Sequence, residues 1–193
     1  FNTMSSEEIK RMYLEKSHGM GFSLIEGTKG LFDGISTDGA DSNAKLASLL
    51  KSQVLLVIDC EGITRGIAPL LEGYKSFGKK LKLNKVILNN VSTSRHESKL
   101  ISAISRYTDF RVLGVIPSIK NFIVERHLGL VPTFQHPKKM KVLSSLVSII
   151  KNNTDYTKLL PLRIKSQKKI IISSPTKKKN SLVVGIASDA AFG

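Results

Sequence analysis

The stretch Ser23–Gly34, which reads SLIEGTKGLFDG, joins a short apolar run to a glycine-rich turn that carries carboxylates. Apolar runs of about 4–8 residues that end at glycine are typical of buried strands. In open α/β sheets, ligands bind beyond the carboxyl ends of such strands. We therefore expect Phe22–Ile25 to form a strand and Glu26 to lie at the mouth of a site.

The turn holds two carboxylates, Glu26 and Asp33, seven residues apart. Mg²⁺ is usually bound by one or two carboxylates together with substrate phosphates, and glycine lets the backbone approach a ligand closely. The spacing therefore suits a magnesium site. A glycine-rich turn with two solvated acids explains the same residues, because short motifs also match by chance. Spacing by itself leaves both interpretations open.

Apolar runs and helical patterns alternate along the rest of the chain. We expect further strands at residues 54–58, 85–88 and 111–116, and helices at residues 5–17, 42–50, 64–77, 97–107 and 142–150. Continuous apolar strands indicate burial on both faces, and their alternation with helices is typical of a parallel sheet. The predicted fold class is α/β, with a mostly parallel sheet and helices on both faces.

Apolar residues at helical spacing predict which helix faces are buried. In the helix at residues 97–107 these residues are Leu100, Ile101 and Ile104. In the helix at residues 142–150 they are Leu143, Leu146, Val147 and Ile150. Ser5 and Ser42 are placed to cap the first two helices.

Composition limits the class of protein. A chain of 193 residues fits one domain, or one domain with part of another. Its single cysteine, Cys60, excludes a disulfide scaffold and indicates a reducing compartment, so we expect a cytoplasmic protein. No apolar run approaches the ~20 residues of a membrane span, and the start, Phe1–Met4, does not resemble a signal peptide. Because Phe1 is not an initiator, we expect a fragment of a longer protein.

The net charge of +15 is unevenly distributed. Residues 138–180 contain 12 basic residues and one acid, a net charge of +11, which leaves +4 for the other 150 residues. Basic tracts are weak indicators of a partner, and no nucleic-acid-binding motif is present. We therefore favour a lysine-rich composition without a nucleic-acid or membrane partner over a binding patch. A basic module that uses Lys138–Lys179 is the alternative.

The glycine-rich stretch Ser23–Gly34 resembles the Glu-Gly-x-x-Gly-Leu-Phe-Asp-Gly motif of cobyrinate (or hydrogenobyrinate) a,c-diamide synthases. These enzymes are the glutamine-dependent amidases of corrin-ring synthesis. Later segments match the same family in order and spacing: Val86–Asn89, Ser94–His96, Leu113–Pro117 and Glu125–Pro132. The run from Glu125 distinguishes this family from related nucleotide-binding families. The resemblance covers Phe22–Pro132 well and Ser181–Phe192 more loosely.

The resemblance implies roles for the residues that match. Glu26 is implied as a catalytic carboxylate that binds Mg²⁺, and Asp33 as a second one that helps hold the metal or orients the substrate. Lys29 departs from the apolar residue that the family more often has there, and the sequence does not decide its role. Asn89 is implied to bind the adenine edge of ATP, and Pro117 to close the base pocket.

Other residues keep competing interpretations. Arg126, with Glu125, is implied to bind a carboxylate of the corrin or a phosphate, whereas a loop-fixing ion pair is the alternative. Asp59 suits an indirect role at the site or a helix cap equally. Arg95 and His96 are more consistent with capping a helix than with approaching a nucleotide.

The implied reaction is amidation of the a and c carboxylates of cobyrinic or hydrogenobyrinic acid, with ATP and Mg²⁺, and with glutamine as ammonia donor. No Gly-x-x-x-x-Gly-Lys-Ser/Thr phosphate loop is present. We therefore expect residues 1–151 to be a partial ATP-binding domain of the P-loop and dethiobiotin synthetase type, 152–181 a linker and 182–193 the start of an amidotransferase domain. Such a fragment should be inactive by itself.

Three alternatives stay open at this point. Cobyric acid synthase and dethiobiotin synthetase share the nucleotide-binding plan, and a partition-type switch ATPase shares the sheet and the strand-end acids. The residues also leave the cobalt content of the substrate undecided. The oligomeric state is open as well, and a homodimer is one option.

Overall fold

The computed structural model describes residues 3–119, 125–126, 129–130 and 139–158. Its helices are α1 (Ser6–Ser17), α2 (Asn43–Leu49), α3 (Ile67–Phe77), α4 (Ser94–Tyr107), α5 (Lys139–Asn153) and the 3-10 turn η2 (Tyr156–Lys158). Its strands are β1 (Gln53–Asp59), β2 (Lys82–Val91), β3 (Arg111–Pro117), β4 (Glu125–Arg126) and β5 (Gly129–Leu130). No helix in these ranges is long and apolar enough to cross a membrane.

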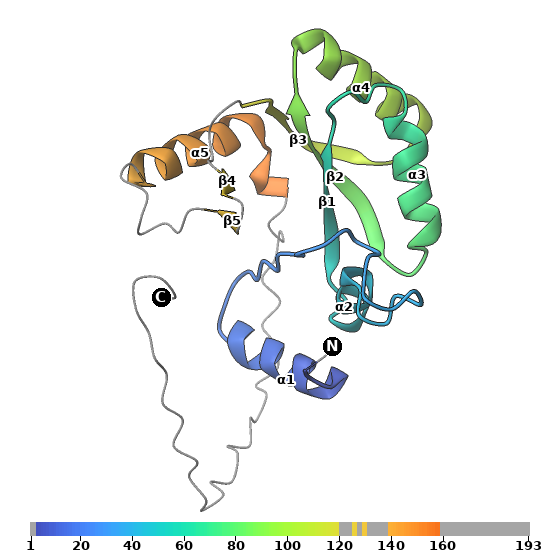
Figure 1. Ribbon diagram of the computed structural model, residues 1–193, viewed down its shortest axis with the longest axis vertical. Helices are drawn as coiled ribbons and strands as arrows, with labels where there is room; N and C mark the ends of the chain where they lie inside the picture. Colours follow the sequence, from blue (N-terminus) through green and yellow to red (C-terminus); the bar gives the residue numbers. More distant parts are fainter. Residues whose placement is uncertain (1–2, 120–124, 127–128, 131–138, 159–193) are drawn as a thin grey trace, which may run out of the picture.

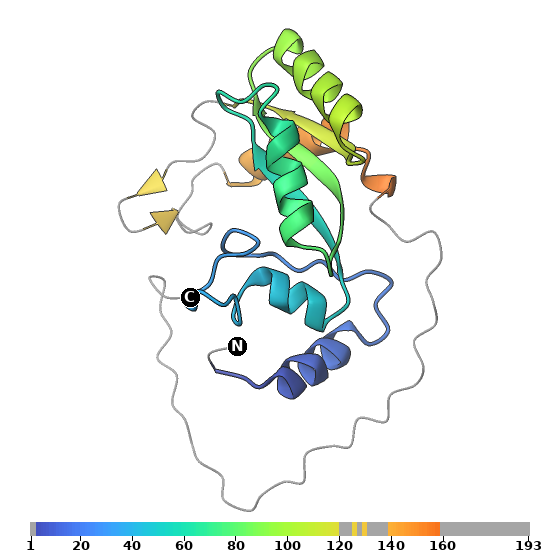
Figure 2. The same ribbon diagram turned by 90° about the vertical axis from the view of Figure 1, so that its right-hand side faces the viewer.

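The central sheet has the order β1-β2-β3, and both pairs are parallel. Helices α3 and α4 cover one face, and α5 lies on the other face beside β3 (Figures 1 and 2). The end of α5 is held by a bridge between Thr154 and Gly114, where a side chain on Gly114 would collide with Thr154. The predicted α/β class, with helices on both faces of a parallel sheet, is confirmed.

The hydrophobic core lies between the sheet and the helices α3 and α4. Its largest fully buried side chains come from β2, α3 and α4: Val86, Leu88, Ile67, Leu71, Leu100 and Ile104. The strands and helices that form it are those predicted from the apolar runs. The prediction that Ile101 is buried is wrong, because its side chain is 39% exposed.

The expected strand at Phe22–Ile25 is wrong. These residues have no ladder partner, and Phe22, Leu24 and Ile25 are 46%, 83% and 44% exposed. A strand requires a neighbouring strand to satisfy its backbone groups, and among the described residues β1 pairs only with β2. The apolar run therefore stays outside the sheet.

The apolar stripe of α5 is also largely uncovered. Leu143, Val147 and Ile150 are 55%, 42% and 49% exposed, although all three were expected to be buried. Within the described residues α5 packs on β3, and a single edge strand is too narrow to cover a helix face. The helix is longer than predicted and ends at Asn153, so the expected boundary at residue 152 falls inside its last turn.

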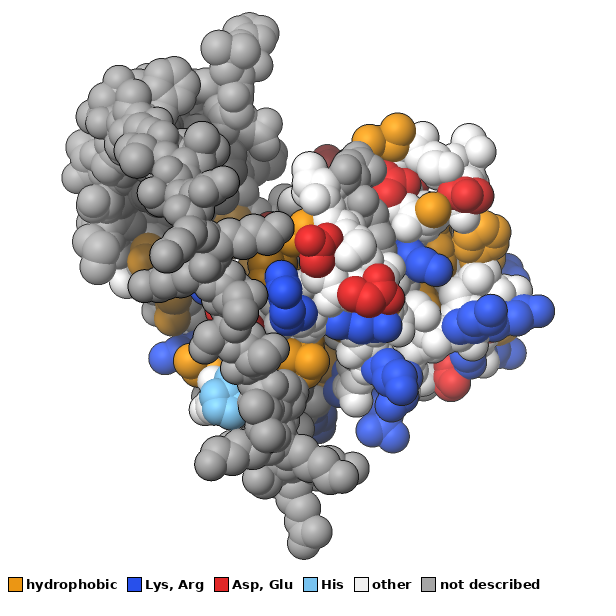
Figure 3. All heavy atoms as spheres, turned by 90° about the horizontal axis from the view of Figure 1, so that it is seen from below, with side chains coloured by type: hydrophobic (Ala, Val, Ile, Leu, Met, Phe, Trp, Pro, Cys, Tyr) orange, Lys and Arg blue, Asp and Glu red, His pale blue; other side chains and the backbone are white. Residues whose placement is uncertain are grey.

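Charged side chains of both signs lie on the face that is seen from below, together with hydrophobic ones (Figure 3). This face is therefore of mixed charge. Most of residues 152–181, which carry much of the basic excess, and all of residues 182–193 lie outside the described part of the chain.

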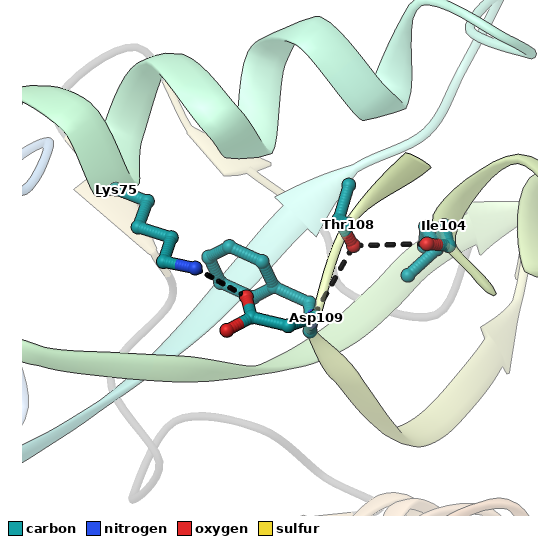
Figure 4. Close-up of polar contacts among 5 residues, drawn as sticks. Lys75, Ile104, Thr108 and Asp109 are labelled. Carbon is teal, nitrogen blue, oxygen red and sulfur yellow. Dashed lines mark hydrogen bonds and ion pairs between the residues drawn. The ribbon is translucent and has the colours of Figure 1, made fainter. Parts of the chain in front are cut away.

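The junction between α4 and β3 is held by Thr108 (Figure 4). Its hydroxyl donates to the carbonyl of Ile104 at 2.9 Å and accepts the backbone N–H of Phe110 at 3.2 Å. Next to it, Lys75 pairs with Asp109 at 2.7 Å, with side chains that are 42% and 63% exposed. The hydroxyl thus serves a helix end and a buried residue, whereas the ion pair faces water.

Thr108→Val should lower the free energy of unfolding by about 1–2 kcal/mol, because the N–H of Phe110 loses its acceptor. Thr108→Ser keeps the hydroxyl and should lose less. Lys75→Ala should lower stability less than Thr108→Val does, since exposed ion pairs contribute little. Urea unfolding of the variants measures all three, and a larger loss for Lys75→Ala than for Thr108→Val would contradict this ranking.

Candidate functional site

Two polar residues meet where the parallel strands end. Asp59 of β1 and Asn89 of β2 are register partners, and Cys60 donates its backbone N–H to the carbonyl of Asn89 at 2.9 Å. Their neighbours Ile58 and Leu88 are buried against α3 and α4. Because side chains alternate along a strand, Asp59 and Asn89 share the opposite face of the sheet. This carboxyl edge is the candidate site.

The carboxylate of Asp59 is held in place by two donors. Its Oδ1 accepts the backbone N–H of Glu61 at 3.0 Å and the side-chain amide of Asn90 at 3.1 Å. The N–H of Glu61 and, second, the amide of Asn90 hold the pKa of Asp59 below its usual value. Asp59 is not a helix cap, because α3 begins at Ile67 after an N-cap at Gly66.

The side-chain amide of Asn89 makes no hydrogen bond to any described residue, and the residue is half-buried. An amide offers both a donor and an acceptor, which is what recognition of a nucleotide base edge requires. Pro117 lies at the same edge, because it pairs in register with Val91 of β2. The structure thus places Asn89, Pro117 and Asp59 at the same carboxyl edge of the sheet.

His96 fastens two loops at this edge. Its Nε2 lies 2.6 Å from the carbonyl of Ile63, and its Nδ1 lies 3.3 Å from the N–H and 3.1 Å from the hydroxyl of Ser92. Because a carbonyl can only accept, these contacts assign the proton to Nε2. The N–H of His96 also bonds to Thr93, the N-cap of α4. The expected helix-capping role is wrong, because Thr93 is the N-cap and Arg95 and His96 lie inside the first turn of α4. His96 instead holds the two loops together.

Cys60 lies directly after β1 and is fully buried. Burial raises the pKa of its thiol, which favours the protonated and less nucleophilic form. Its Sγ lies 3.5 Å from the carbonyl of Ile58. Cys60 is thus a buried thiol at the end of a strand.

The glycine-rich turn lies at the opposite end of the sheet. Leu31 packs against the core, and Phe32 stacks on Tyr74 at 5.7 Å between ring centroids and meets the ring of Phe77 edge-on at 4.9 Å. Tyr74 and Phe77 lie in the last turn of α3, just before β2 begins. The turn is therefore anchored at the amino edge, and the structure does not bring Asp33 together with Asn89.

The glycines of this turn have local explanations. A Cβ on Gly30 would collide with the carboxylate of Asp33, and one on Gly34 would collide with that of Asp41. Asp41 in turn accepts the backbone N–H groups of Ile35 and Ser36 at 2.8 and 3.2 Å, and these bonds lower its pKa. Gly30 and Gly34 therefore make room for nearby carboxylates of the chain rather than for a ligand.

Glu26 and Asp33 are both exposed. No group of three or more His, Cys, Asp or Glu side chains in the described ranges is arranged to hold a metal ion. Two exposed carboxylates on one turn still fit Mg²⁺, because that ion takes most of its oxygens from water and phosphate. Carboxylate oxygens therefore suit Mg²⁺ as ligands. The turn lies away from Asn89, however, so its position does not support a metal site next to a nucleotide there.

Glu125 and Arg126 form β4, which pairs antiparallel with β5. Their side chains, and the whole of His127, lie outside the described residues. The roles expected for Glu125 and Arg126 stay predictions.

Among the hollows of the described part of the chain, two lie beside α3. One, of about 540 Å³, lies between α3 and α4, where the guanidinium of Arg65 sits 5.4 Å from the ring centroid of Tyr107. The other, of about 350 Å³, lies beside the end of α3 and the start of β2. Neither is lined by Asp59 or Asn89, so we place the candidate site at the strand ends on the strength of its polar groups.

The lowered pKa of Asp59 predicts a pH-dependent contribution to stability. The native carboxyl binds its proton less tightly than the unfolded one, whose pKa is about 3.9. Its contribution is therefore complete above that value and is lost as the pH falls through the lower native pKa. The stability difference between wild type and Asp59→Asn should be constant above about pH 5 and shrink below about pH 4. Urea unfolding between pH 7 and pH 3 measures this, and parallel curves for the two proteins throughout would contradict it.

Comparisons with known proteins identify the family to which the chain is similar. Residues 3–126 match the family model described as AAA domain. The cobyrinate a,c-diamide synthase of Magnetococcus marinus is 34% identical over 98% of this chain and 42% of its own length. That of Caldanaerobacter subterraneus subsp. tengcongensis is 32% identical over the same shares. That of Methanocaldococcus jannaschii is 37% identical over 75% of this chain and 32% of its own length.

The chain spans about two-fifths of the length of the curated relatives that it matches along almost all of its own length. No solved structure matches it. The parallel sheet and the family match together confirm the expected P-loop NTPase-like fold class. The chain belongs to the AAA domain family, and the predicted resemblance to cobyrinate a,c-diamide synthases is confirmed.

Proposed function

We propose that this chain is part of an ATP-dependent cobyrinate a,c-diamide synthase that takes its ammonia from glutamine. The observation that carries the proposal is the similarity of nearly the whole chain to proteins of that name. The unpartnered amide of Asn89 at the carboxyl edge supports it, because its donor and acceptor can pair with the edge of an adenine base.

The proposed reaction activates a carboxylate before amidation. A carboxylate oxygen of cobyrinic or hydrogenobyrinic acid attacks the γ-phosphorus of ATP, which forms an acyl phosphate and releases ADP. Ammonia from glutamine then attacks the acyl carbon, the C–O bond to phosphate breaks, and the nitrogen loses a proton to give the amide. Phosphate leaves far more readily than oxide, which is why ATP is needed. The cycle runs once for each of the two carboxylates.

The chain's own residues would position the nucleotide. Asn89 would accept from and donate to the base edge, with Pro117 flanking the base. Mg²⁺, when bound, neutralises charge on the phosphates. The role of Glu26 and Asp33 as its ligands rests on the family resemblance and not on their position in this chain. The role of Arg126, with Glu125, in holding a corrin carboxylate rests on the same resemblance.

Exposed apolar surface around β1 supports the proposal that further protein covers this part of the sheet. Val57 lies in the middle of β1 and is 61% exposed, whereas parallel sheets are normally covered on both faces. Phe22–Ile25 is an exposed apolar run without a strand partner. The relatives are more than twice as long as the part that aligns. We therefore propose that the chain works within a longer enzyme and is inactive by itself. The proposed linker starts after the 3-10 turn that ends at Lys158, later than the expected residue 152, and residues 182–193 are the proposed start of the amidotransferase part.

The full-length gene product should convert cobyrinic or hydrogenobyrinic acid to the a,c-diamide with ATP and glutamine, and residues 1–193 should not. In the full-length protein Glu26→Gln should lower the rate by roughly a hundredfold, as expected for a group that stabilises charge in phosphoryl transfer. Glu15→Gln, an exposed change on α1, is the matched control. Mass spectrometry of the products measures the rates. An undiminished rate for Glu26→Gln would remove Glu26 from the mechanism, and amidation by residues 1–193 would contradict their inactivity.

Base recognition by Asn89 predicts a preference for ATP over ITP, which has an oxygen in place of the adenine amino group. Asn89→Ala should bring the ratio of the two dissociation constants close to one, because the amide that distinguishes the bases is lost. Asn152→Ala, on exposed α5, is the control. Competition against a fluorescent nucleotide, with the full-length protein, measures both constants. If Asn89→Ala kept the full preference for ATP, Asn89 would not be the base-reading residue.

A further inference from the structure

Strand β2 has one extra residue at the candidate site. Leu88 pairs with Val115 and Val91 with Pro117, so three steps along β2 face two along β3. The ladder resumes beyond this point, where Ser118 donates its N–H to the carbonyl of Val91 at 3.0 Å. The extra residue is a β-bulge, a feature that re-aims side chains near sites.

Asn90 makes this bulge possible. Its φ is 56°, in the left-handed region, which side chains other than glycine seldom adopt and asparagine adopts most readily. A glycine would satisfy the backbone equally well. The side chain of Asn90 therefore has a separate purpose, and its Nδ2 donates to Oδ1 of Asp59 at 3.1 Å.

The bond from Asn90 closes a ring of contacts around Asn89. Asp59 faces Asn89 across the β1–β2 ladder, and the carbonyl of Asn89 accepts the N–H of Cys60 at 2.9 Å. On its other side Asn89 is followed directly by the left-handed residue. The backbone of Asn89 is thus held from β1 and from the bulge, while its own amide has no partner among the described residues.

We propose that Asn90 is a positioning residue for base recognition: its left-handed backbone and its hydrogen bond to Asp59 orient the amide of Asn89 toward an adenine nucleotide. This inference rests on the proposed function, because it assumes that Asn89 reads the base. Asn90 does not itself touch the nucleotide. The carboxylate of Asp59 is the acceptor that holds Asn90, and the N–H of Glu61 keeps that carboxylate in place.

The test exchanges donor and acceptor within the pair, in the full-length protein. Asn90→Asp places two carboxylates together and should lower the preference for ATP over ITP about tenfold, the equivalent of about 1.4 kcal/mol. Asp59→Asn combined with Asn90→Asp restores one amide facing one carboxylate and should recover most of that preference. Asn90→Gly keeps the backbone conformation without the side chain and should behave like Asn90→Asp.

Lys51→Gly is the matched control, because Lys51 is the other described non-glycine residue with positive φ, at 52°, and it lies before β1 at the far end of the sheet. This change should leave the ratio of dissociation constants unaltered. The melting temperature of each variant is recorded, since a purely structural role would move stability and not the ratio.

The outcomes separate this inference from the function on which it rests. If Asn89→Ala removes the preference for ATP while Asn90→Asp and Asn90→Gly keep it, Asn89 reads the base and the positioning role of Asn90 is wrong. If the double variant does not recover what Asn90→Asp loses, the hydrogen bond to Asp59 is not the cause. If Asn89→Ala itself keeps the preference, the proposed function fails at this site.

Discussion

The parallel pairing of β1 with β2 is the constraint on which the rest of the structure depends. Its register sets Asp59 beside Asn89 and lets Cys60 donate to the carbonyl of Asn89. The same register turns Ile58 and Leu88 toward α3 and α4. A slip of one residue would send polar side chains into the core and apolar ones to the edge. The burial of the core and the composition of the candidate site are therefore two consequences of one alignment.

Prediction from sequence succeeded where burial and pattern coincide. The runs in β1, β2 and β3 are apolar on both faces, and each is followed by a helix with an apolar stripe, so the parallel sheet follows from the pattern. The same apolar pattern at Phe22–Ile25 produced no strand, and that of Leu143, Val147 and Ile150 is exposed. A periodic pattern shows that a surface needs a partner, but it does not show that the partner lies within the chain.

The position of the candidate site was predictable from its strand-end residues, and the contacts between them were not. Asp59, Asn89 and Pro117 end strands, where ligands bind in parallel sheets, while the roles proposed for Asn89 and Pro117 come from the family resemblance. The hydrogen bond of Asn90 to Asp59 and the contact of His96 with Ile63 have no short-range signal, because both join segments about thirty residues apart in sequence. The pair of asparagines at the end of β2 is a local signal for the bulge, since asparagine tolerates the left-handed conformation.

The motif at Ser23–Gly34 contains residues with separate physical roles. Leu31 and Phe32 bury apolar surface against the core and the end of α3, and the glycines make room for the carboxylates of Asp33 and Asp41. These positions would be required in any protein that folds the turn this way, whether or not it binds a metal. Glu26 has no such structural explanation, because it is exposed and makes no hydrogen bond to a described residue. Its role as a metal ligand therefore stays a proposal that rests on the family resemblance.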